Sequence, residues 1–478
     1  MLQRVIIYFW LFLALVFFST SCEKDSQKND NENELPEIPE VIIPTSVTDS
    51  FESGNIGVIN RYNDTLWKFY IGNDNDDPGL PESFRAWWSV RMDHVRKGAL
   101  TEFSVQNSGW PYFYIPVYGY NTKEYRRFDV SETNQYPGNE ILVRKEFEDT
   151  TAYLAMFYPY TLTDLEDYLS NIAGNEFINI EVAGTSQQGR PVYLIKITDN
   201  SVPVEGKKRV IIHARTHPAE IPSSFVIEGL INQLLSGLPD MAAILSQFEF
   251  YIFPMQNVDG VVAGNYRTTT QSENLELMWY YDGSNPMDLT GNAPIEVQII
   301  HSTAKRLMTD GGPPVTMALN LHASASEPDI RPFFFPHFGP QYLGYTETES
   351  SLWDKQVHFI ERVAEYYGWN MLEPLADEGG GSFAGKTYPE SWWWVNFQDQ
   401  VMAMTMEMTY GRSGYAPEWV TPDNLRDLGS ALLYGIRDYY QSPVIRNKVT
   451  SATNRQQRLG ELEFPHLYPP ASPDEMKE

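Results

Sequence analysis

A histidine and a glutamate three residues apart suggest a shared metal ion in the stretch His217-Pro-Ala-Glu220. The β-branched run Arg209–His213 has no polar alternation, which predicts a buried strand just before this stretch. Apolar residues at helical spacing follow it. His217 and Glu220 are therefore expected on the loop and first helical turn at the carboxyl end of a strand, where open α/β sheets place their chemistry. An imidazole and a carboxylate at this spacing can converge on zinc.

Three other stretches also place reactive side chains near strand ends. Val315–Leu321 predicts a buried strand that ends on His322, and two histidines with one carboxylate would leave a fourth zinc position open, as in catalytic sites. Glu407 lies inside an apolar strand, so it either finds a partner or serves as a general base with a raised pKa. Arg267 ends the loop after the expected strand Phe248–Phe253 and offers a fixed positive charge to an oxyanion.

These motifs occur in the order known from the zinc carboxypeptidases. The sequence resembles the cytosolic-carboxypeptidase-like branch, whose pattern reads HPGE, NPDG, NYR, then a histidine, then T-x-E. The matching stretches are His217–Glu220, Pro254–Gly260, Asn265–Arg267, His322 and Thr405–Glu407. The resemblance covers Ser50 to Gln441 and includes a β-sandwich ahead of the catalytic domain, with Tyr158-Pro-Tyr160 at the junction.

The resemblance implies a zinc-dependent hydrolase of metallocarboxypeptidase type that cleaves a peptide bond. His217, Glu220 and His322 would bind one zinc ion per chain. Glu407 would take a proton from the zinc-bound water and deliver it to the leaving amine, and Arg267 would polarise the scissile carbonyl. The metal would act as a Lewis acid and lower the pKa of the water to about 7.

One segment departs from the family pattern. Where the branch has Asp-Leu-Asn-Arg-x-Trp, this chain has Asn274-Leu-Glu-Leu-Met-Trp279. In the family, the Asn and Arg of that motif grip the free carboxylate of the substrate, and the Asp orients a zinc histidine. Leu277 cannot form the arginine fork and Glu276 would repel a carboxylate, whereas Asn274 can still accept from an imidazole N–H. We therefore expect an intact metal site and a lost carboxylate anchor.

Several residues are candidates for contact with the substrate. Arg215 lies between the expected ligands, with a surface ion pair as its alternative, and Asn265 and Glu276 join it in the expected substrate-binding set. Tyr388 is placed as the substrate-capping tyrosine of the family. Arg331, Lys386 and Arg412 are candidates for a cation that takes the place of the lost arginine. His213 is expected in the core or behind the metal ligands.

The amino-terminal segment has the features of an export signal. Val5–Phe18 is a run of fourteen apolar residues, too short to span a bilayer but typical of a signal peptide. Cys22, the only cysteine, resembles the lipidated cysteine of bacterial lipoproteins, with Ser19 in place of the usual leucine. We expect an extracytoplasmic protein anchored by lipid at Cys22 to the bacterial outer membrane, with exposure on the cell surface as a hypothesis.

Net charge narrows the range of partners. The chain has 35 basic and 63 acidic residues, and loss of a signal peptide containing Arg4 would change the net charge from −28 to −29. This charge disfavours nucleic acid and anionic membrane surfaces as partners. The expected substrate is a peptide or a peptidoglycan-derived molecule, and the oligomeric state is left open.

The alternation of predicted elements indicates an α/β fold with a mostly parallel mixed sheet and helices on both faces, preceded by an all-β sandwich. The expected strands are Val192–Thr198, Val210–His213, Phe248–Phe253, Val315–Leu321 and Val401–Met408. The expected helices are Ala219–Ser236, Pro294–Met308, Leu352–Tyr367 and Pro422–Tyr440. The expected divisions are a signal peptide at 1–21, a disordered acidic tether at 22–45, the sandwich at 46–160, the catalytic domain at 161–445 and a tail at 446–478.

Two other functional classes are compatible with these residues. A zinc amidase or esterase would use the same metal residues on a substrate without a free carboxyl terminus. A non-catalytic cell-surface binding protein is the third reading, but a binding protein would have no need to keep Glu407 and Arg267.

Overall fold

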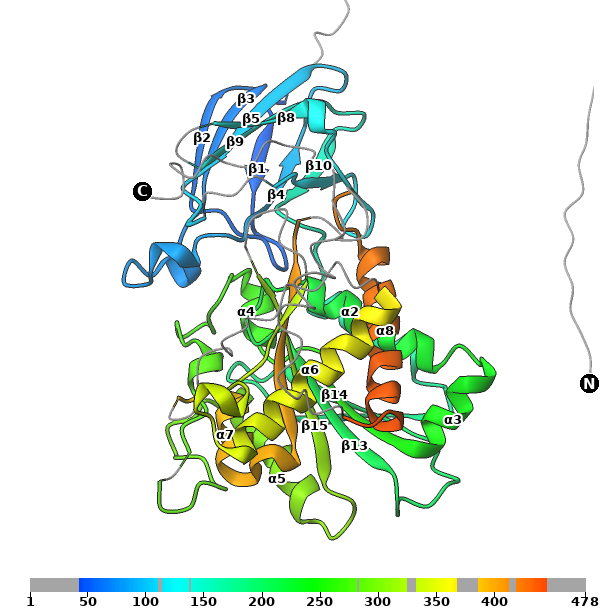
Figure 1. The fold of residues 1–478 in the computed structure, drawn as a ribbon. Helices are drawn as coiled ribbons and strands as arrows, with labels where there is room; N and C mark the ends of the chain where they lie inside the picture. The colour runs from blue at the N-terminus through cyan, green and yellow to red at the C-terminus, as the bar shows by residue number, and fades with distance from the viewer. Residues whose placement is uncertain are drawn as a thin grey trace, which may run out of the picture. The chain divides into compact units, whose positions relative to one another are not determined.

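The computed structural model describes residues 43–110, 114–136, 139–281, 283–324, 332–367, 386–411 and 418–444 (Figure 1). The predicted signal peptide, Cys22 and the tail from residue 446 lie outside the described residues. The described helices and strands belong to one compact unit, Pro44–Glu478. Within these ranges, no helix has both the length and the apolar character needed to cross a bilayer.

The amino-terminal part is built from two five-stranded sheets. The first contains, in spatial order, β1 (Ser46–Thr48), β4 (Ser89–Asp93), β10 (Thr151–Ala155), β6 (Val117–Gly119) and β7 (Tyr125–Arg127). The second contains β2 (Val58–Asn63), β3 (Leu66–Tyr70), β5 (Leu100–Gln106), β9 (Glu140–Glu146) and β8 (Thr133–Tyr136). Short 3₁₀ helices connect them: η1 (Asp74–Asp76), η2 (Glu82–Phe84) and η3 (Val130–Glu132).

Large aromatic side chains fill the space between these two sheets. Phe69 and Phe103 of the second sheet lie 5.6 Å apart between ring centroids, and Trp88, just before β4 of the first sheet, lies 6.5 Å from Phe103. All three side chains are buried. The alternation of buried and partly exposed residues along β3 matches the period of two expected of a strand with one face in a core. These aromatic side chains therefore form the core of a β-sandwich, the kind of domain that the sequence predicts ahead of the α/β fold.

The carboxy-terminal part is built on one seven-stranded mixed sheet. Its spatial order is β11 (Ile178–Thr185), β12 (Pro191–Ile197), β14 (Phe248–Phe253), β13 (Lys208–Ala214), β15 (Val315–Ser324), β17 (Met402–Thr409) and β16 (Phe333–Phe335). The four strands β14, β13, β15 and β17 run parallel, and the outer pairings are antiparallel. Parallel strands end at the same edge, so the residues that follow them can meet there.

Eight α-helices accompany this sheet in the described ranges. They are α1 (Leu162–Ile172), α2 (Pro222–Leu234), α3 (Pro239–Gln247), α4 (Val258–Ala263), α5 (Ile295–Thr309), α6 (Glu347–Tyr367), α7 (Pro389–Phe397) and α8 (Pro422–Gln441). The 3₁₀ helices here are η4 (Leu275–Leu277), η5 (Gln341–Leu343) and η7 (Gln398–Gln400). Thr161 and Thr421 cap α1 and α8 through reciprocal bonds with the third helical residue, which fixes where these helices begin.

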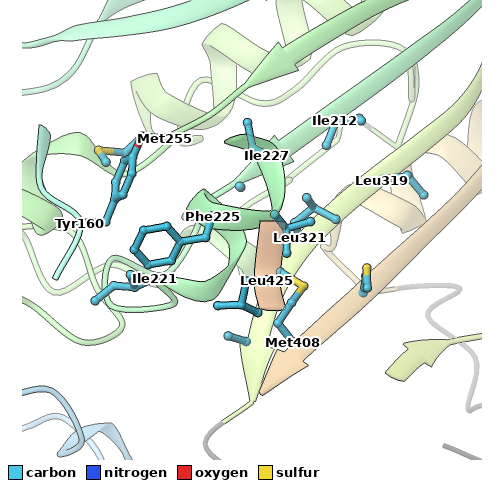
Figure 2. Close-up of a cluster of buried hydrophobic side chains, with 14 of the residues drawn as sticks. Tyr160, Ile212, Ile221, Phe225, Ile227, Met255, Leu319, Leu321, Met408 and Leu425 are labelled. Atoms are coloured by element: carbon cyan, nitrogen blue, oxygen red, sulfur yellow. The ribbon is translucent and has the colours of Figure 1, made fainter. Parts of the chain in front are cut away.

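One face of the central strands packs against helices α2 and α8. Figure 2 shows this core, where Phe225 and Ile227 of α2 and Leu425 of α8 gather with Leu319 and Leu321 of β15. All five side chains are buried. Because strand side chains alternate between the two faces, the odd-numbered leucines of β15 face these helices and the even-numbered residues point the other way.

The opposite face of the sheet is covered by α5 and α7. His213 of β13 lies with its ring 6.3 Å from Trp279, and Trp279 lies 6.3 Å from His301 of α5. His301 in turn contacts Trp392 of α7 at 5.0 Å. Helices therefore cover both faces, as the alternation predicts, and His322 belongs to the face of α5 and α7.

The predicted fold class is confirmed, with differences in detail. The helix expected from Ala219 begins instead at Pro222, so Glu220 lies in the turn before α2 and not in its first turn. Elements β11, β16, α3, α4 and α7 were not predicted. Two of them, β16 and α4, are too short to show a period, and the run Trp392–Trp394 in α7 is apolar on every side.

Candidate metal centre

The three predicted zinc ligands come together at the carboxyl ends of β13 and β15. His217 Nδ1 lies 2.7 Å from Glu220 Oε1, and His322 Nδ1 lies 2.7 Å from Glu220 Oε2. The two imidazole Nδ1 atoms are 3.1 Å apart. One ligand atom from each residue lies within 4.8 Å of the other two, and all three side chains are buried. Four donor atoms packed this closely are electrostatically tolerable only around a shared proton or cation.

The chain geometry explains why the ligands converge. His217 follows β13 directly, and Pro222 at the first helical position starts α2 just beyond Glu220, so the ligand turn is held between a strand and a helix. His322 lies near the end of the adjacent parallel strand β15. Both elements thus present their ligands at one edge of the sheet.

The outer nitrogen of each imidazole faces an oxygen acceptor. His217 Nε2 lies 3.0 Å from Asn274 Oδ1, and His322 Nε2 lies 3.2 Å from Glu276 Oε2. An acceptor at Nε2 favours the tautomer with its proton on that atom, which leaves Nδ1 free to bind a metal. The predicted contact of Asn274 with an imidazole is confirmed.

The charges of the site favour a cation at its centre. Burial disfavours charge on Glu220, yet His217 and His322 hold its pKa well below the usual value. Burial likewise opposes protonation of His322, but the carboxylates of Glu220 and Glu276 raise its pKa well above the ordinary histidine value. Protonated His322 thus supplies the positive charge that the two acids attract, and a divalent metal ion fits the same donor set.

Glu407 lies directly beside the ligands. It is the register partner of His322 between β15 and β17, so the two side chains emerge on the same face of the sheet. Its Oε2 is buried and has no hydrogen-bond partner among the described residues. Burial, reinforced by the charge of Glu220, raises the pKa of Glu407 to about 8. A carboxyl group in this position is suited to proton transfer near neutral pH.

Arg267 completes the site with a positive charge. Its guanidinium NH1 lies 3.8 Å from Glu220 Oε1, and 28% of the side chain is exposed. Burial opposes its charge, but Glu220, Tyr266 and Glu407 raise the pKa of Arg267 above its ordinary value, so it stays cationic. The site therefore combines a metal-ligand triad, a free carboxyl group and a partly accessible cation.

Comparison with known proteins identifies both halves of the chain. Residues 165–292 match the family model described as zinc carboxypeptidase, and residues 47–157 match the model described as cytosolic carboxypeptidase N-terminal domain. Residues 165–292 are thus similar to zinc carboxypeptidase domains, and residues 47–157 are similar to the amino-terminal domain of cytosolic carboxypeptidases. The first model describes zinc carboxypeptidases, and His217, Glu220 and His322 offer a donor set that suits such a metal.

The chain is similar to curated proteins that are longer than itself. Human cytosolic carboxypeptidase 2 is 31% identical over 254 residues, which cover 47% of this chain and 28% of the human protein. Mouse cytosolic carboxypeptidase 6 is 30% identical over 247 residues, which cover 48% of this chain and 45% of the mouse protein. The chain thus spans less than half the length of these relatives.

Solved structures support the fold. A metallo-carboxypeptidase from Burkholderia cenocepacia has a TM-score of 0.67 at 21% identity, over 84% of this chain and 99% of that one. A metallo-carboxypeptidase from Pseudomonas aeruginosa, in complex with (2-guanidinoethylmercapto)succinic acid, has a TM-score of 0.67 at 21% identity, over 83% of this chain and 99% of that one. The sandwich and the α/β sheet are therefore a shared architecture.

Two residues expected at the substrate are structural instead. Arg215 is fully enclosed, and it donates to the backbone oxygens of Pro218 and Tyr160 and to the hydroxyl of Ser224. It stabilises the ligand turn from behind, so both its expected substrate contact and its alternative surface ion pair are wrong. Asn265 is also buried, and it donates to the side chain of Asn75 and to two backbone oxygens of the following turn.

Glu276 was predicted to contact the substrate, but its side chain turns to other residues of the protein. Its carboxylate accepts from Asn320 Nδ2 at 3.2 and 3.1 Å and lies beside the imidazole of His322. The two neighbours lower the pKa of Glu276 to about 2 against the opposing effect of burial. Leu277, the position of the family arginine, is 43% exposed. The sequence has a leucine at the position of the family arginine, but it did not reveal that Glu276 turns towards the metal centre.

The remaining candidates are placed only in part. Tyr388 lies at the start of α7 with a half-buried side chain against the core, and its capping role stays a prediction. Lys386 is exposed. Arg331 and Arg412 lie outside the described residues. His213 is buried and its pKa is lowered to about 4 by desolvation, which places it in the core behind the ligands as expected.

Sequence reasoning missed three residues that contact this site or its supports. Glu390 of α7 is buried and accepts from Thr405 Oγ1 at 2.8 Å, and burial followed by the charge of Glu276 raises its pKa to about 7. Asp74 and Phe84 of the sandwich contact the segment that carries Arg267. Asp74 stands in a surface-like acidic run, Asp74-Asn-Asp-Asp77, so nothing in its local sequence signals burial.

Proposed function

We propose that this chain hydrolyses a peptide or related amide bond as a zinc metallocarboxypeptidase. The observation that carries the proposal is the convergence of His217, Glu220 and His322, with Glu407 in register beside them. Two nitrogen donors and one carboxylate leave an open fourth position, which separates catalytic from closed structural zinc sites. When bound, zinc supplies a Lewis acid and lowers the pKa of a water molecule into the neutral range.

Glu407 acts as the general base in this proposal. Its unpartnered Oε2 can accept a proton from the attacking water and pass it to the leaving amine. The pKa of about 8 belongs to the metal-free cluster, in which Glu407 stands beside the negative charge of Glu220. A bound dication would compensate that charge and favour the ionised, proton-accepting form.

Arg267 binds and polarises the carbonyl group of the substrate. Its partial exposure lets a substrate oxygen approach, while Glu220 on one side and the ring of Phe84, 5.3 Å from the guanidinium carbon, limit the directions it can take. A fixed positive charge in a partly buried site stabilises an oxyanion more than a mobile surface arginine would.

Recognition of the substrate carboxyl terminus is atypical in this proposal. Leu277 offers no cation, and Glu276 is engaged by Asn320 and His322. A peptide carboxylate would need another cation, or the substrate would carry none at that place. The second possibility favours an amidase or esterase reaction with the same metal residues as the alternative function.

The proposed cellular location rests on the amino-terminal sequence. We infer lipid attachment at Cys22 after removal of residues 1–21, anchorage to the bacterial outer membrane, and a peptide or peptidoglycan-derived substrate outside the cytoplasm. The apolar run Val5–Phe18 and the cysteine directly behind small residues support this inference. Palmitate labelling of Cys22→Ser beside the natural chain tests it, since only the natural chain should incorporate the label.

A release assay on matched peptides tests the function. Peptides with free and with amidated carboxyl termini are incubated with the natural chain, with chelator, and with Glu407→Gln. We expect zinc-dependent hydrolysis, and a loss of about 10²–10⁴-fold in Glu407→Gln with zinc still bound, because a general base contributes that much. Glu181→Gln, an exposed glutamate of β11, is the matched control.

The outcomes separate the candidate functions. Preference for the free terminus supports the carboxypeptidase, and equal or better cleavage of the amide supports the amidase. An unchanged rate in Glu407→Gln would remove that residue from the mechanism. Absence of both bound zinc and hydrolysis on peptides, esters and amides would favour a binding protein.

A further inference from the structure

The segment that carries Arg267 is held by a carboxylate from the sandwich. Asp74 of η1 accepts from the backbone N–H of Tyr266 at 2.6 Å, of Arg267 at 2.8 Å and of Thr268 at 2.8 Å. The hydroxyl of Thr268 adds a fourth bond at 3.0 Å. Asp74 is 1% exposed, although it lies 192 residues away from Tyr266 in the chain. One carboxylate thus gathers three consecutive amides of the segment.

Other sandwich residues hold the same segment from nearby positions. Asn75, next to Asp74, accepts from Asn265 Nδ2 at 2.9 Å and donates to the carbonyl of Thr269 at 2.9 Å. Ser53 Oγ donates to the carbonyl of Val261 at 2.6 Å. Two separate sandwich loops therefore fix the backbone on both sides of Arg267.

The side chain of Arg267 is guided by the sandwich as well. Its guanidinium carbon lies 5.3 Å from the ring centroid of Phe84, within the range of a cation–π contact. The backbone oxygen of Tyr266 accepts from Ala219 N–H of the ligand turn at 3.1 Å. The segment held by Asp74 therefore touches the metal-ligand turn on one side and the sandwich on the other.

We propose that Asp74 is a positioning residue, through which the sandwich domain sets the place of Arg267 over the metal centre. This inference rests on the role of Arg267 in the proposed function. Three adjacent amide N–H groups point at one carboxylate, so loss of its negative charge leaves these donors without a matched acceptor and lets the segment shift. The sandwich is on this view a part of the active site and not only a neighbouring domain.

The test compares Asp74→Asn with the natural zinc-loaded chain. Asparagine keeps one acceptor oxygen but replaces the other with an NH2 group that faces a backbone N–H, so the segment should move while the side-chain volume stays nearly the same. We expect kcat to fall roughly a hundredfold, the typical cost of displacing a catalytic group by about 1 Å, while zinc content is unchanged. The backbone amides of residues 265–269 should also exchange with deuterium at least tenfold faster.

Two further variants separate positioning from a merely structural effect. Asp129→Asn is the control, because Asp129 of the same domain also accepts from a backbone N–H, that of Ser131, but is exposed and bonds within its own turn at η3. It should leave kcat unchanged. In an Arg267→Ala background, Asp74→Asn should lower kcat less than twofold further, since its effect passes through that arginine. Phe84→Leu, which keeps an apolar side chain, should give a smaller fall in kcat and serves if Asp74→Asn does not fold.

Each result decides for or against the inference. Unchanged amide exchange at residues 265–269 overturns it whatever the activity, and so does a full additive loss of kcat in the Arg267→Ala background. Faster exchange with an unchanged kcat overturns the positioning role as well. If the natural chain hydrolyses no substrate, the proposed function fails, while the amide exchange of Asp74→Asn still shows whether the sandwich holds the segment.

Discussion

The site has two sides that share the segment Asn274–Leu277. The metal side contains His217, Glu220 and His322, and the carboxylate side is the position of Leu277, where the family pattern has an arginine. On the metal side, His217 and His322 each have a partner at both ring nitrogens, and every ligand is buried. On the carboxylate side, Leu277 is 43% exposed and offers no charge. Within the four residues of η4 and its cap, Asn274 and Glu276 thus contact the two histidines, whereas Leu277 contributes no charge.

In this chain the segment Asn274–Glu276 supports both metal-site histidines. In the resembling family pattern, the acid at the position of Asn274 orients a zinc histidine. Here Asn274 keeps that contact without a charge, and Glu276 brings a carboxylate to the second histidine. The negative charge is thus moved by two residues rather than lost. The charged acceptor should make His322 the more basic metal ligand, and the neutral acceptor should leave His217 the less basic one.

Removal of a ligand should have the largest effect. We expect His322→Ala to weaken zinc binding about a hundredfold to a thousandfold, because an apparent binding energy of about 10–16 kcal/mol shared among four ligand positions gives about 2.5–4 kcal/mol for each. Leu277→Ala, on the carboxylate side, should leave zinc affinity unchanged. Competition with a chromogenic chelator measures both variants. Equal affinity of His322→Ala and the natural chain would show that the metal side is wrongly assigned.

Glu276→Gln sharpens the comparison, because Glu276 lies between the two sides. Loss of a carboxylate partner of a ligating histidine costs about 10–100-fold in metal affinity, so zinc affinity should fall by that factor. If Glu276 contacted the substrate instead, zinc affinity would stay constant and KM would change. Asn274→Asp is the complementary variant, and it should strengthen zinc binding by restoring a charge beside His217. The same chelator competition, with KM measured in parallel, distinguishes the two roles.

Leu277→Arg tests whether the carboxylate side can be rebuilt. A guanidinium at this half-exposed position should lower KM for free-terminus peptides about fivefold, less than the gain of about 1.5–3 kcal/mol possible for a buried charged bond. Peptides with amidated termini should show no gain. Leu277→Gln is the matched polar control without charge. The same improvement on both kinds of peptide would mean that the arginine acts on something other than the carboxylate.

The sequence predicted the metal side better than the carboxylate side for a physical reason. His217, Glu220 and His322 each lie at the end of a buried strand or in the turn that follows one, and strand ends can be located from apolar runs. The direction of a loop side chain depends on distant partners. Glu276 of η4 turns to His322 because Asn320 of β15 donates to its carboxylate, and no pattern in the sequence around Glu276 encodes that contact.

The same limit applies to buried polar residues outside the predicted strands. Arg215 stands between two ligands in the sequence, yet its positive φ of 56° and its three backbone and hydroxyl acceptors turn it into the core. Asp74 lies in an acidic run that is typical of a surface loop, and only the packing of the sandwich against residues 265–269 buries it. Burial created by contacts between distant segments is not visible in local composition.

Glu390→Gln gives the smallest expected effect. It tests whether the negative charge of Glu276 raises the pKa of Glu390. Burial first, and then the charge of Glu276, raises the pKa of Glu390 from 4.5 to about 7 in the metal-free protein. A carboxyl group with a raised folded-state pKa gives stability that is fully present below about pH 4.5 and is lost as the pH rises through about 7. Glutamine stays neutral and can still accept from Thr405, so it escapes this loss.

We therefore expect metal-free Glu390→Gln to melt a few degrees above the natural chain at pH 9, since about 1 kcal/mol shifts Tm by a few degrees in a large domain. At pH 4, below the ordinary pKa of 4.5, the two should melt together. Glu181→Gln, on the exposed strand β11, should show no difference at either pH. The gain at pH 9 should shrink in a Glu276→Gln background, because one of the two causes of the shift has then been removed. A gain of the same size in both backgrounds would mean that burial alone raises the pKa of Glu390. The charge of Glu276 would then be compensated by His322 and have no effect on Glu390.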